Sequence, residues 1–166
     1  MFFWDGEQLV SLNNFLTNKM THKKYHRRDV AVEQLNVAID LFLSEKSYIA
    51  ALTLAGAAEE ILGKALEHTG NESAIDEIFS ISSYFEEAHL ANVNGYTTEK
   101  KFISVLNKER NDVKHWGNPS EAILEADFKQ SAKEMLVRAC RNCDLLDISH
   151  TKLMTSFNHW FDEHES

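Results

Sequence analysis

Residues 107–119, NKERNDVKHWGNP, carry the side chains best suited to acid–base chemistry on a phosphate. Arg110 offers a planar, permanently charged guanidinium that hydrogen-bonds phosphate oxygens. His115, five residues later, carries an imidazole, a side chain that can give or take a proton. Lys114 adds positive charge beside it. Together these groups can bind a phosphodiester and assist attack by an internal 2′-hydroxyl, without a metal.

The spacing of Arg110 and His115 sets a geometric condition on such a site. Five steps along an α-helix turn through about 500°, so the two side chains start about 140° apart. Arg110 shares a ridge with Leu106 at the edge of the predicted buried side, and we expect it to be half buried. His115 lies on a polar ridge and points outward, just before Gly117 ends the helix. Within one chain the two side chains therefore do not share a face.

The hexapeptide RNDVKH resembles the R-N-x-x-x-H signature of the HEPN family, named for higher eukaryotes and prokaryotes nucleotide-binding. The signature's Arg, Asn and His fall on Arg110, Asn111 and His115. The resemblance covers roughly residues 28–147. It implies a bundle of four to five helices that forms a homodimer, with two motifs facing each other across the interface. Facing motifs would meet the geometric condition, because a site shared by two chains does not need one face of one helix.

The same resemblance implies a chemistry. Many HEPN proteins are metal-independent endoribonucleases, often toxins or defence effectors, whose products carry a 2′,3′-cyclic phosphate. By this resemblance Arg110 neutralises the scissile phosphate, His115 is the general acid or base, and Asn111 orients His115 or the phosphate. Other members are inactive nucleotide- or protein-binding regulatory modules, and some members pair with a nucleotidyltransferase-like antitoxin.

Three interpretations of the motif follow. The sequence favours a ribonuclease, because the Arg, Asn and His are all present. The alternative is a non-catalytic HEPN-like binding module, which the acidic composition favours. A structural bundle in which the motif is a chance helix end stays open as well.

Glu59 lies in the segment GAAEE, on the same helical ridge as Leu62, so its carboxylate is predicted to face the core. A carboxylate facing a core needs a partner. We expect Glu59 to pair with Arg110 or His115 and to fix it, whereas Glu60 is expected to be solvated. The alternative is a glutamate at the rim of the core, satisfied by water or a lysine.

Positive charge is concentrated in one segment of an acidic chain. The net charge is −9, which disfavours a protein that coats nucleic acid with its whole surface. Residues 19–28, KMTHKKYHRR, nevertheless hold five of the 17 lysines and arginines and no acid. Lys23, Lys24, Arg27 and Arg28 are therefore candidate contacts for an RNA backbone. The alternative is a solvated helix start or linker.

The rest of the sequence predicts an all-α protein. One proline and six glycines in 166 residues favour long helices with short turns. Apolar spacing predicts helices over residues 6–20, 29–44, 47–69, 72–91, 97–116 and 121–146. Their predicted buried sides include Ile78, Val105 and Leu124.

These helices form one organised unit with two extensions. We expect an antiparallel, HEPN-like bundle of four to five helices at 28–147, preceded by a helix and basic stretch at 1–27. An amphipathic tail occupies 148–166. Its aromatic residues predict either a dimer contact or packing on the bundle of the same chain.

Cofactor and membrane sites are not predicted. Cys140 and Cys143 form a CxxC inside a predicted helix, which favours two core thiols over a redox or zinc site. No histidine spacing suits a metal, so we expect no metal and no cofactor. No apolar run is long enough for a bilayer, and MFFW is followed directly by acids, unlike a signal peptide. Two cysteines without a disulfide framework suit a cytoplasm. The expected partners are a second copy and RNA or a nucleotide, with an antitoxin protein as a further candidate.

Overall fold

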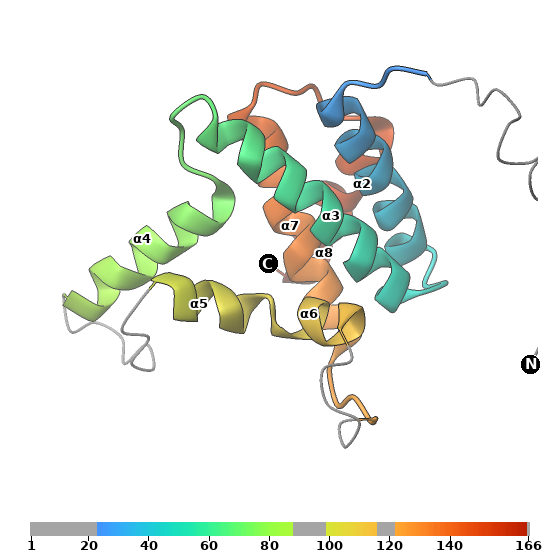
Figure 1. The fold of residues 1–166 in the computed structure, drawn as a ribbon. Coiled ribbons are helices and arrows are strands. Elements are labelled where there is room, and N and C mark those ends of the chain that lie inside the picture. Colours follow the sequence, from blue (N-terminus) through green and yellow to red (C-terminus); the bar gives the residue numbers. More distant parts are fainter. Residues whose placement is uncertain (1–22, 88–98, 116–121, 166) are drawn as a thin grey trace, which may run out of the picture.

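The computed structural model describes residues 23–87, 99–115 and 122–165 (Figure 1). The described residues contain helices and no strand, which confirms the all-α prediction. The helices are α2 (Arg27–Leu43), α3 (Tyr48–Glu67), α4 (Ala74–Glu87), α5 (Glu99–Leu106), α6 (Lys108–Lys114), α7 (Phe128–Leu145) and α8 (Lys152–Glu165). The helix expected at 6–20 lies outside the described residues, as do Trp116, Gly117 and Pro119.

Local sequence explains where the central helix α3 begins and ends. The side chain of Ser47 accepts a hydrogen bond from the backbone N–H of Ala50 (3.2 Å), which satisfies one of the free donors of the first turn. Small and aliphatic residues then repeat at helical spacing and are fully buried from Ala51 to Leu66. Gly70 follows with a φ of +76°, a left-handed conformation that glycine adopts without a steric penalty.

The hydrophobic core lies between α2, α3, α7 and α8. The aromatic side chain of Phe42 on α2 is nearly fully buried, and its ring lies 4.9 Å from the ring of Trp160 on α8. Met154 and Phe157 of α8 are also buried. The aromatic tail therefore packs on the bundle of its own chain, which is one of the two arrangements that the sequence predicts.

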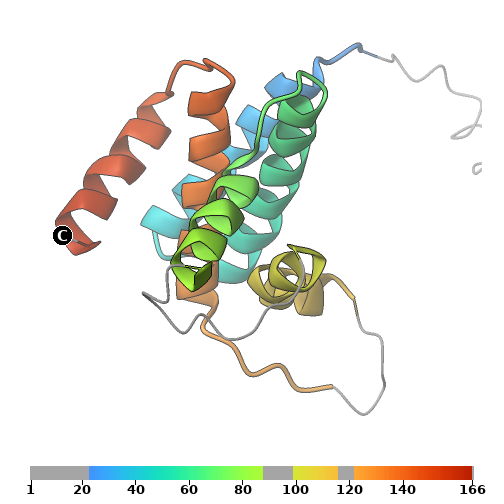
Figure 2. The same cartoon turned by 90° about the vertical axis from the view of Figure 1, so that its left-hand side faces the viewer.

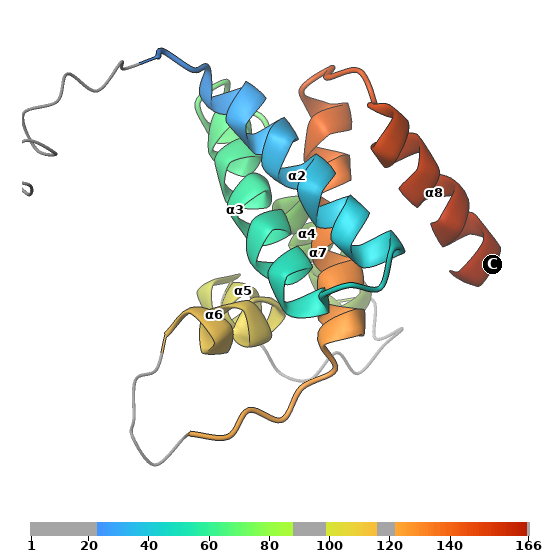
Figure 3. The same cartoon turned by 90° about the vertical axis from the view of Figure 1, so that its right-hand side faces the viewer.

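The helices form layers with α8 on one side and α3 on the other, and α2 and α7 lie between them (Figures 2 and 3). The short 44–47 turn makes α2 and α3 antiparallel. By contrast, α3 and α7 run in the same direction, since Glu59 lies near Arg138 and Gly63 lies near Asn142. The intervening α4, α5 and α6 carry the chain back to the start of the bundle (Figure 1).

The structure corrects the predicted helix over residues 97–116, which is two helices. The break falls at Asn107, whose side-chain oxygen accepts a hydrogen bond from Arg138 of α7 (2.7 Å). Asparagine is a weak helix former, and this contact fixes its side chain toward α7. The bend gives α6 a direction of its own, and α6 carries the motif.

Two other expectations are wrong in detail. The helix expected from residue 121 begins only at Phe128, because Asp127 caps it by accepting a hydrogen bond from the backbone N–H of Gln130 (3.0 Å). Leu124 thus lies outside the helix and is exposed. Ile78 of α4 and Val105 of α5, expected to face inward, are exposed as well.

Candidate functional site

Arg110 projects from α6 across the surface of α3. Its side chain is only 12% exposed, which agrees with the half-buried position that the sequence predicts. It passes over Gly56, where a Cβ would lie 2.5 Å from Nε and 2.7 Å from Cδ of Arg110. Only a residue without a side chain leaves room for this approach. Gly56 therefore makes a shallow seat on α3 for the motif arginine.

The guanidinium of Arg110 is held in this seat by Glu60, one turn further along α3. Its Nη2 donates a hydrogen bond to Oε2 of Glu60, and the two form an ion pair. This hydrogen bond lowers the pKa of Glu60 below its ordinary value, although burial acts in the opposite direction. Glu60 is exposed, as expected, and its carboxylate is also the partner of Arg110, which the sequence did not predict.

Glu59 faces the core, as predicted, and is 6% exposed. Its predicted pairing is wrong, because the ion pair of Arg110 is made with Glu60 and His115 lies elsewhere. Burial raises the pKa of the Glu59 carboxyl above its ordinary value, and the positive charges of Arg138 and then Arg110 oppose that rise. Glu59 thus acts on the motif arginine through charge.

Arg138 is a buried arginine that sequence reasoning missed. It lies on α7 beside Met135, and its Nη2 donates to Asn107 at the bend between α5 and α6. Its Nε and Nη1 have no hydrogen-bond partner in the structure, so the nearby charge of Glu59 is its main compensation. The signal was present in the sequence, because an arginine on the apolar stripe of α7 needs a carboxylate facing the same core.

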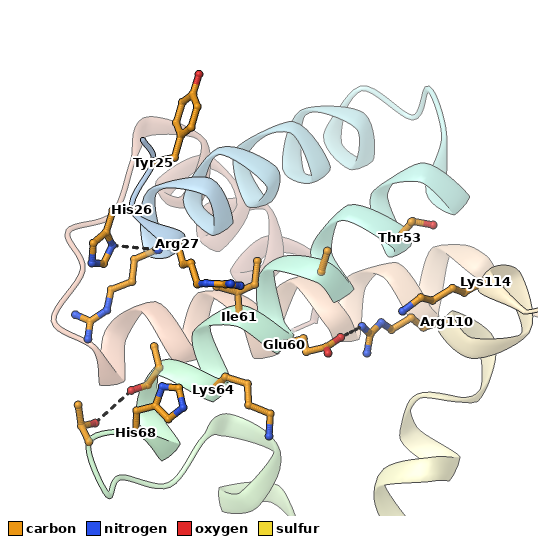
Figure 4. Close-up of a pocket in the computed structure, with 14 residues that line it drawn as sticks. Tyr25, His26, Arg27, Thr53, Glu60, Ile61, Lys64, His68, Arg110 and Lys114 are labelled. Carbon is orange, nitrogen blue, oxygen red and sulfur yellow. Dashed lines mark hydrogen bonds and ion pairs between the residues drawn. The ribbon is translucent and has the colours of Figure 1, made fainter. Parts of the chain in front are cut away.

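A groove of about 920 Å³ runs along α3 and contains the Arg110 seat (Figure 4). Five lysines and arginines line it against one carboxylate, Glu60. The lining also includes an exposed tyrosine and two histidines. The polar and charged lining residues are Tyr25, His26, Arg27, Arg28, Thr53, Glu60, Lys64, His68, Thr69, Arg110 and Lys114. On a chain of net charge −9, this groove is a local concentration of positive charge.

The groove brings together two sets of residues that lie far apart in the sequence. Arg27 and Arg28 start α2 at one end of the groove, and Arg110 and Lys114 on α6 lie at the other (Figure 4). Lys23 and Lys24, also predicted to contact RNA, are exposed ahead of α2 and outside the groove lining. The groove lining thus begins at Tyr25, two residues before α2, and leaves out the two lysines that precede it.

His115 lies on another side of α6. It is the residue at which α6 ends, with an extended backbone (φ −129°, ψ 116°), and its N–H donates to the backbone oxygen of Asn111 (2.9 Å). Its side chain is exposed and lines a second hollow of about 580 Å³ with Asp112 and the apolar residues Ile123 and Leu124. The helical spacing predicts that His115 and Arg110 of one chain lie on different faces. The structure agrees, because the two residues line different hollows.

Asn111 is exposed and lies one residue beyond Arg110 on α6. Its backbone N–H donates to Asn107 and its backbone oxygen accepts from His115, so its main chain closes the helix. The predicted orienting role stays a prediction.

The remaining predicted features are simpler. Cys140 and Cys143 are buried in α7, and burial raises their thiol pKa values to about 12 and about 11, as suits core residues. In the described parts of the chain, no group of three or more potential ligands is arranged to hold a metal. No helix among the described residues has the length and apolar character needed to cross a membrane.

Comparison with known proteins adds no family assignment. No family model, no curated protein and no solved structure matches the chain. The HEPN resemblance stays a prediction that is carried by Arg110, Asn111 and His115.

Proposed function

We propose that the protein is a HEPN-type, metal-independent endoribonuclease. One observation carries the proposal: Arg110 and Lys114 of the motif helix line the same groove as Arg27 and Arg28. A phosphate backbone lying in this groove would meet positive charge along its length. These side chains concentrate positive charge on the surface that contains the motif, in a chain of net charge −9.

In this mechanism Arg110 binds the scissile phosphate. Its planar donors match phosphate oxygens, and its seat on Gly56 keeps most of its length out of solvent. Glu60 already accepts from Nη2, so the phosphate takes the remaining donors or displaces Glu60. Lys114 lines the groove beside Arg110 and adds charge for the phosphoryl oxygens.

His115 moves the protons of the reaction. The 2′-hydroxyl next to the scissile phosphate attacks phosphorus as its proton passes to a base, and the bond to the 5′-oxygen breaks. That oxygen takes a proton from an acid, leaving a 2′,3′-cyclic phosphate and a 5′-hydroxyl. His115 can serve as the acid or the base, because imidazole exchanges protons near neutral pH.

A second copy of the chain completes the site. Since Arg110 and His115 line different hollows, one chain alone offers only half of the catalytic pair. In a two-fold dimer the same patch of each chain faces its counterpart, so Arg110 of one protomer can meet His115 of the other. The exposed Ile123 and Leu124 beside His115 supply apolar surface for such a contact.

A non-catalytic binding module is the second candidate, and one contact favours it. Arg110 is largely buried and already paired with Glu60, as in a structural arginine. In that case the groove binds a nucleotide or a nucleic acid without cleavage. The cellular role that suits the enzyme is a toxin or defence effector, restrained by an antitoxin partner.

A cleavage assay separates the two candidates. Purified protein is incubated with mixed RNA in EDTA beside Arg110→Ala and His115→Ala variants. We expect the parent to cleave and both variants to be inactive, with products that end in a 2′,3′-cyclic phosphate. A parent that binds RNA but never cleaves it supports the binding module.

Mixing the two inactive variants tests the shared site. If each site takes Arg110 from one chain and His115 from the other, a mixed dimer contains one intact site. Random exchange of subunits then restores about a quarter of the parent activity. Absence of any recovery after verified subunit exchange contradicts a site shared in this way.

A further inference from the structure

The far end of the groove, away from Arg110, is a binding surface in its own right. Arg27 and Arg28 begin α2 there, and neither has an ion-pair partner among the described residues. His68, just beyond α3, lines the same end. Arg27 is exposed and Arg28 is partly buried, so both guanidinium groups are open to a ligand from the groove.

Two aromatic residues, Tyr25 and His26, also line this end of the groove. Tyr25 is 67% exposed and lines the groove immediately before α2. His26 lies beside it, with its Nδ1 accepting the backbone N–H of Arg28 (3.2 Å), so its ring orientation is fixed by the helix cap. Figure 4 shows Tyr25, His26 and Arg27 at the α2 end of the groove, with the Tyr25 ring directed outward, away from His26 and Arg27. Exposed rings at the edge of a positively charged groove are a usual platform for unpaired bases.

The groove is long enough for several nucleotides. Thr53 and Ala65 both line it and are 12 residues apart on α3, a rise of about 18 Å. This length matches about five stacked nucleotides at about 3.4 Å each. A mononucleotide would leave most of the groove empty.

We propose that Tyr25, His26, Arg27 and Arg28 form an exosite for single-stranded RNA, which runs from there along α3 to Arg110. The arginines hold backbone phosphates and Tyr25 stacks on a base, while Lys64 lies on the path between the two ends. Single strands fit better than a duplex, because a duplex hides its base faces and is read by its shape. The inference rests on the proposed function for the choice of RNA as ligand.

Binding without cleavage tests the exosite. The probe is a fluorescent single-stranded RNA of about 12 nucleotides with 2′-O-methyl riboses, which lacks the attacking hydroxyl and cannot be cut. Anisotropy gives its dissociation constant at several salt concentrations. A hairpin of the same composition and a poly-glutamate peptide are the competing ligands.

Three variants give the expected pattern. Tyr25→Ala weakens binding by about tenfold through loss of stacking. Arg27→Ala with Arg28→Ala lowers the slope of log affinity against log salt by about 1.4, which corresponds to two phosphate contacts on a single strand. The matched control, Lys46→Ala with Lys152→Ala, removes two charges outside the groove and leaves both quantities unchanged.

Other outcomes overturn the exosite. They are equal losses in the control pair, hairpin affinity as high as that of the single strand, or tight binding of poly-glutamate alone.

Failure of the exosite can be distinguished from failure of the proposed ribonuclease. Loss of cleavage in Arg110→Ala with unchanged binding in the Tyr25 and Arg27 variants leaves the ribonuclease and removes the exosite. Variant-sensitive binding by a protein that never cleaves RNA leaves the exosite and removes the ribonuclease.

Discussion

The guanidinium of Arg110 on α6 donates a hydrogen bond to the carboxylate of Glu60 on α3, 50 residues earlier in the chain. This ion pair ties the motif helix to the central helix of the bundle. It also places a negative charge at the point where a phosphate would bind. Glu60 therefore both orients Arg110 and competes with the ligand.

Glu60→Gln should strengthen RNA binding. The substitution removes the one carboxylate in the groove lining and keeps an acceptor for Arg110. We expect tighter binding by about 1 kcal/mol, roughly fivefold in dissociation constant. The measurement is anisotropy with a non-cleavable RNA. Glu45→Gln is the control, since Glu45 pairs with Lys129 and neither residue lines the groove. Equal gains in both variants would show only an effect of net charge.

Gly56→Ala should unseat Arg110. The new Cβ would lie within 2.7 Å of two side-chain atoms of Arg110, so the arginine must leave its place on α3. We expect RNA cleavage to fall by at least about tenfold, as for loss of one positioned cation. Thermal stability should change little, because the better helix propensity of alanine, about 1 kcal/mol, offsets the lost ion pair.

Gly63→Ala is the matched control for that experiment. It lies two turns along the same helix, and its Cβ would make an ordinary contact at 3.6 Å with Ser73. This variant should gain stability and keep full cleavage. If both glycine variants cleave RNA equally well, the seat on Gly56 has no part in the activity.

The sequence predicts a helix well where its buried face is a regular row of apolar residues. The 47–69 pattern found α3 within two residues at each end, because its buried face is apolar and its Ser47 cap is a standard one. The expected 97–116 helix failed at Asn107, because the bend depends on Arg138 of α7. No local pattern contains a contact between residues 31 positions apart.

The candidate site was also predictable where local sequence determines it, and unpredictable where contacts between distant residues determine it. Helical spacing alone separated Arg110 from His115, and the structure places them on different hollows. The choice between Glu59 and Glu60 as the partner of Arg110 depends on the direction of α6, which the bend at Asn107 sets. Arg27 and Arg110 line one groove only because α2 and α6 both pack against α3, so the groove could not be predicted from the sequence.

Glu59→Gln should change how stability depends on pH. Burial raises the pKa of Glu59, so between 4.5 and its folded pKa the folded state holds a proton that the unfolded chain has released. The parent therefore loses stability as pH rises through this window, and the variant does not. We expect the stability of Glu59→Gln relative to the parent to increase as the pH rises above 4.5, measured by urea unfolding.

In the same experiment, Glu60→Gln should change the pH dependence of stability in the opposite direction. Its hydrogen bond with Arg110 lowers the pKa of Glu60, so the parent gains stability as pH rises and loses it as pH falls through the lowered pKa. This variant should lose stability relative to the parent as pH rises. Parallel curves for the two variants would contradict the assigned environments of both carboxyl groups.

Ile123→Asp should separate the proposed dimer. Ile123 is 89% exposed and lines the hollow that contains His115, so it would be covered if that face meets a second copy. A carboxylate there would be buried without a partner, at a cost of about 3 kcal/mol, or roughly a 100-fold rise in the dimer dissociation constant. Light scattering coupled to size exclusion measures the assembly, and RNA cleavage should fall with the dimer fraction.

Ile81→Asp on α4 is the control, because Ile81 is also exposed but lies outside that hollow. If Ile81→Asp alone yields monomers, the interface lies on α4, and His115 is not supplied across it.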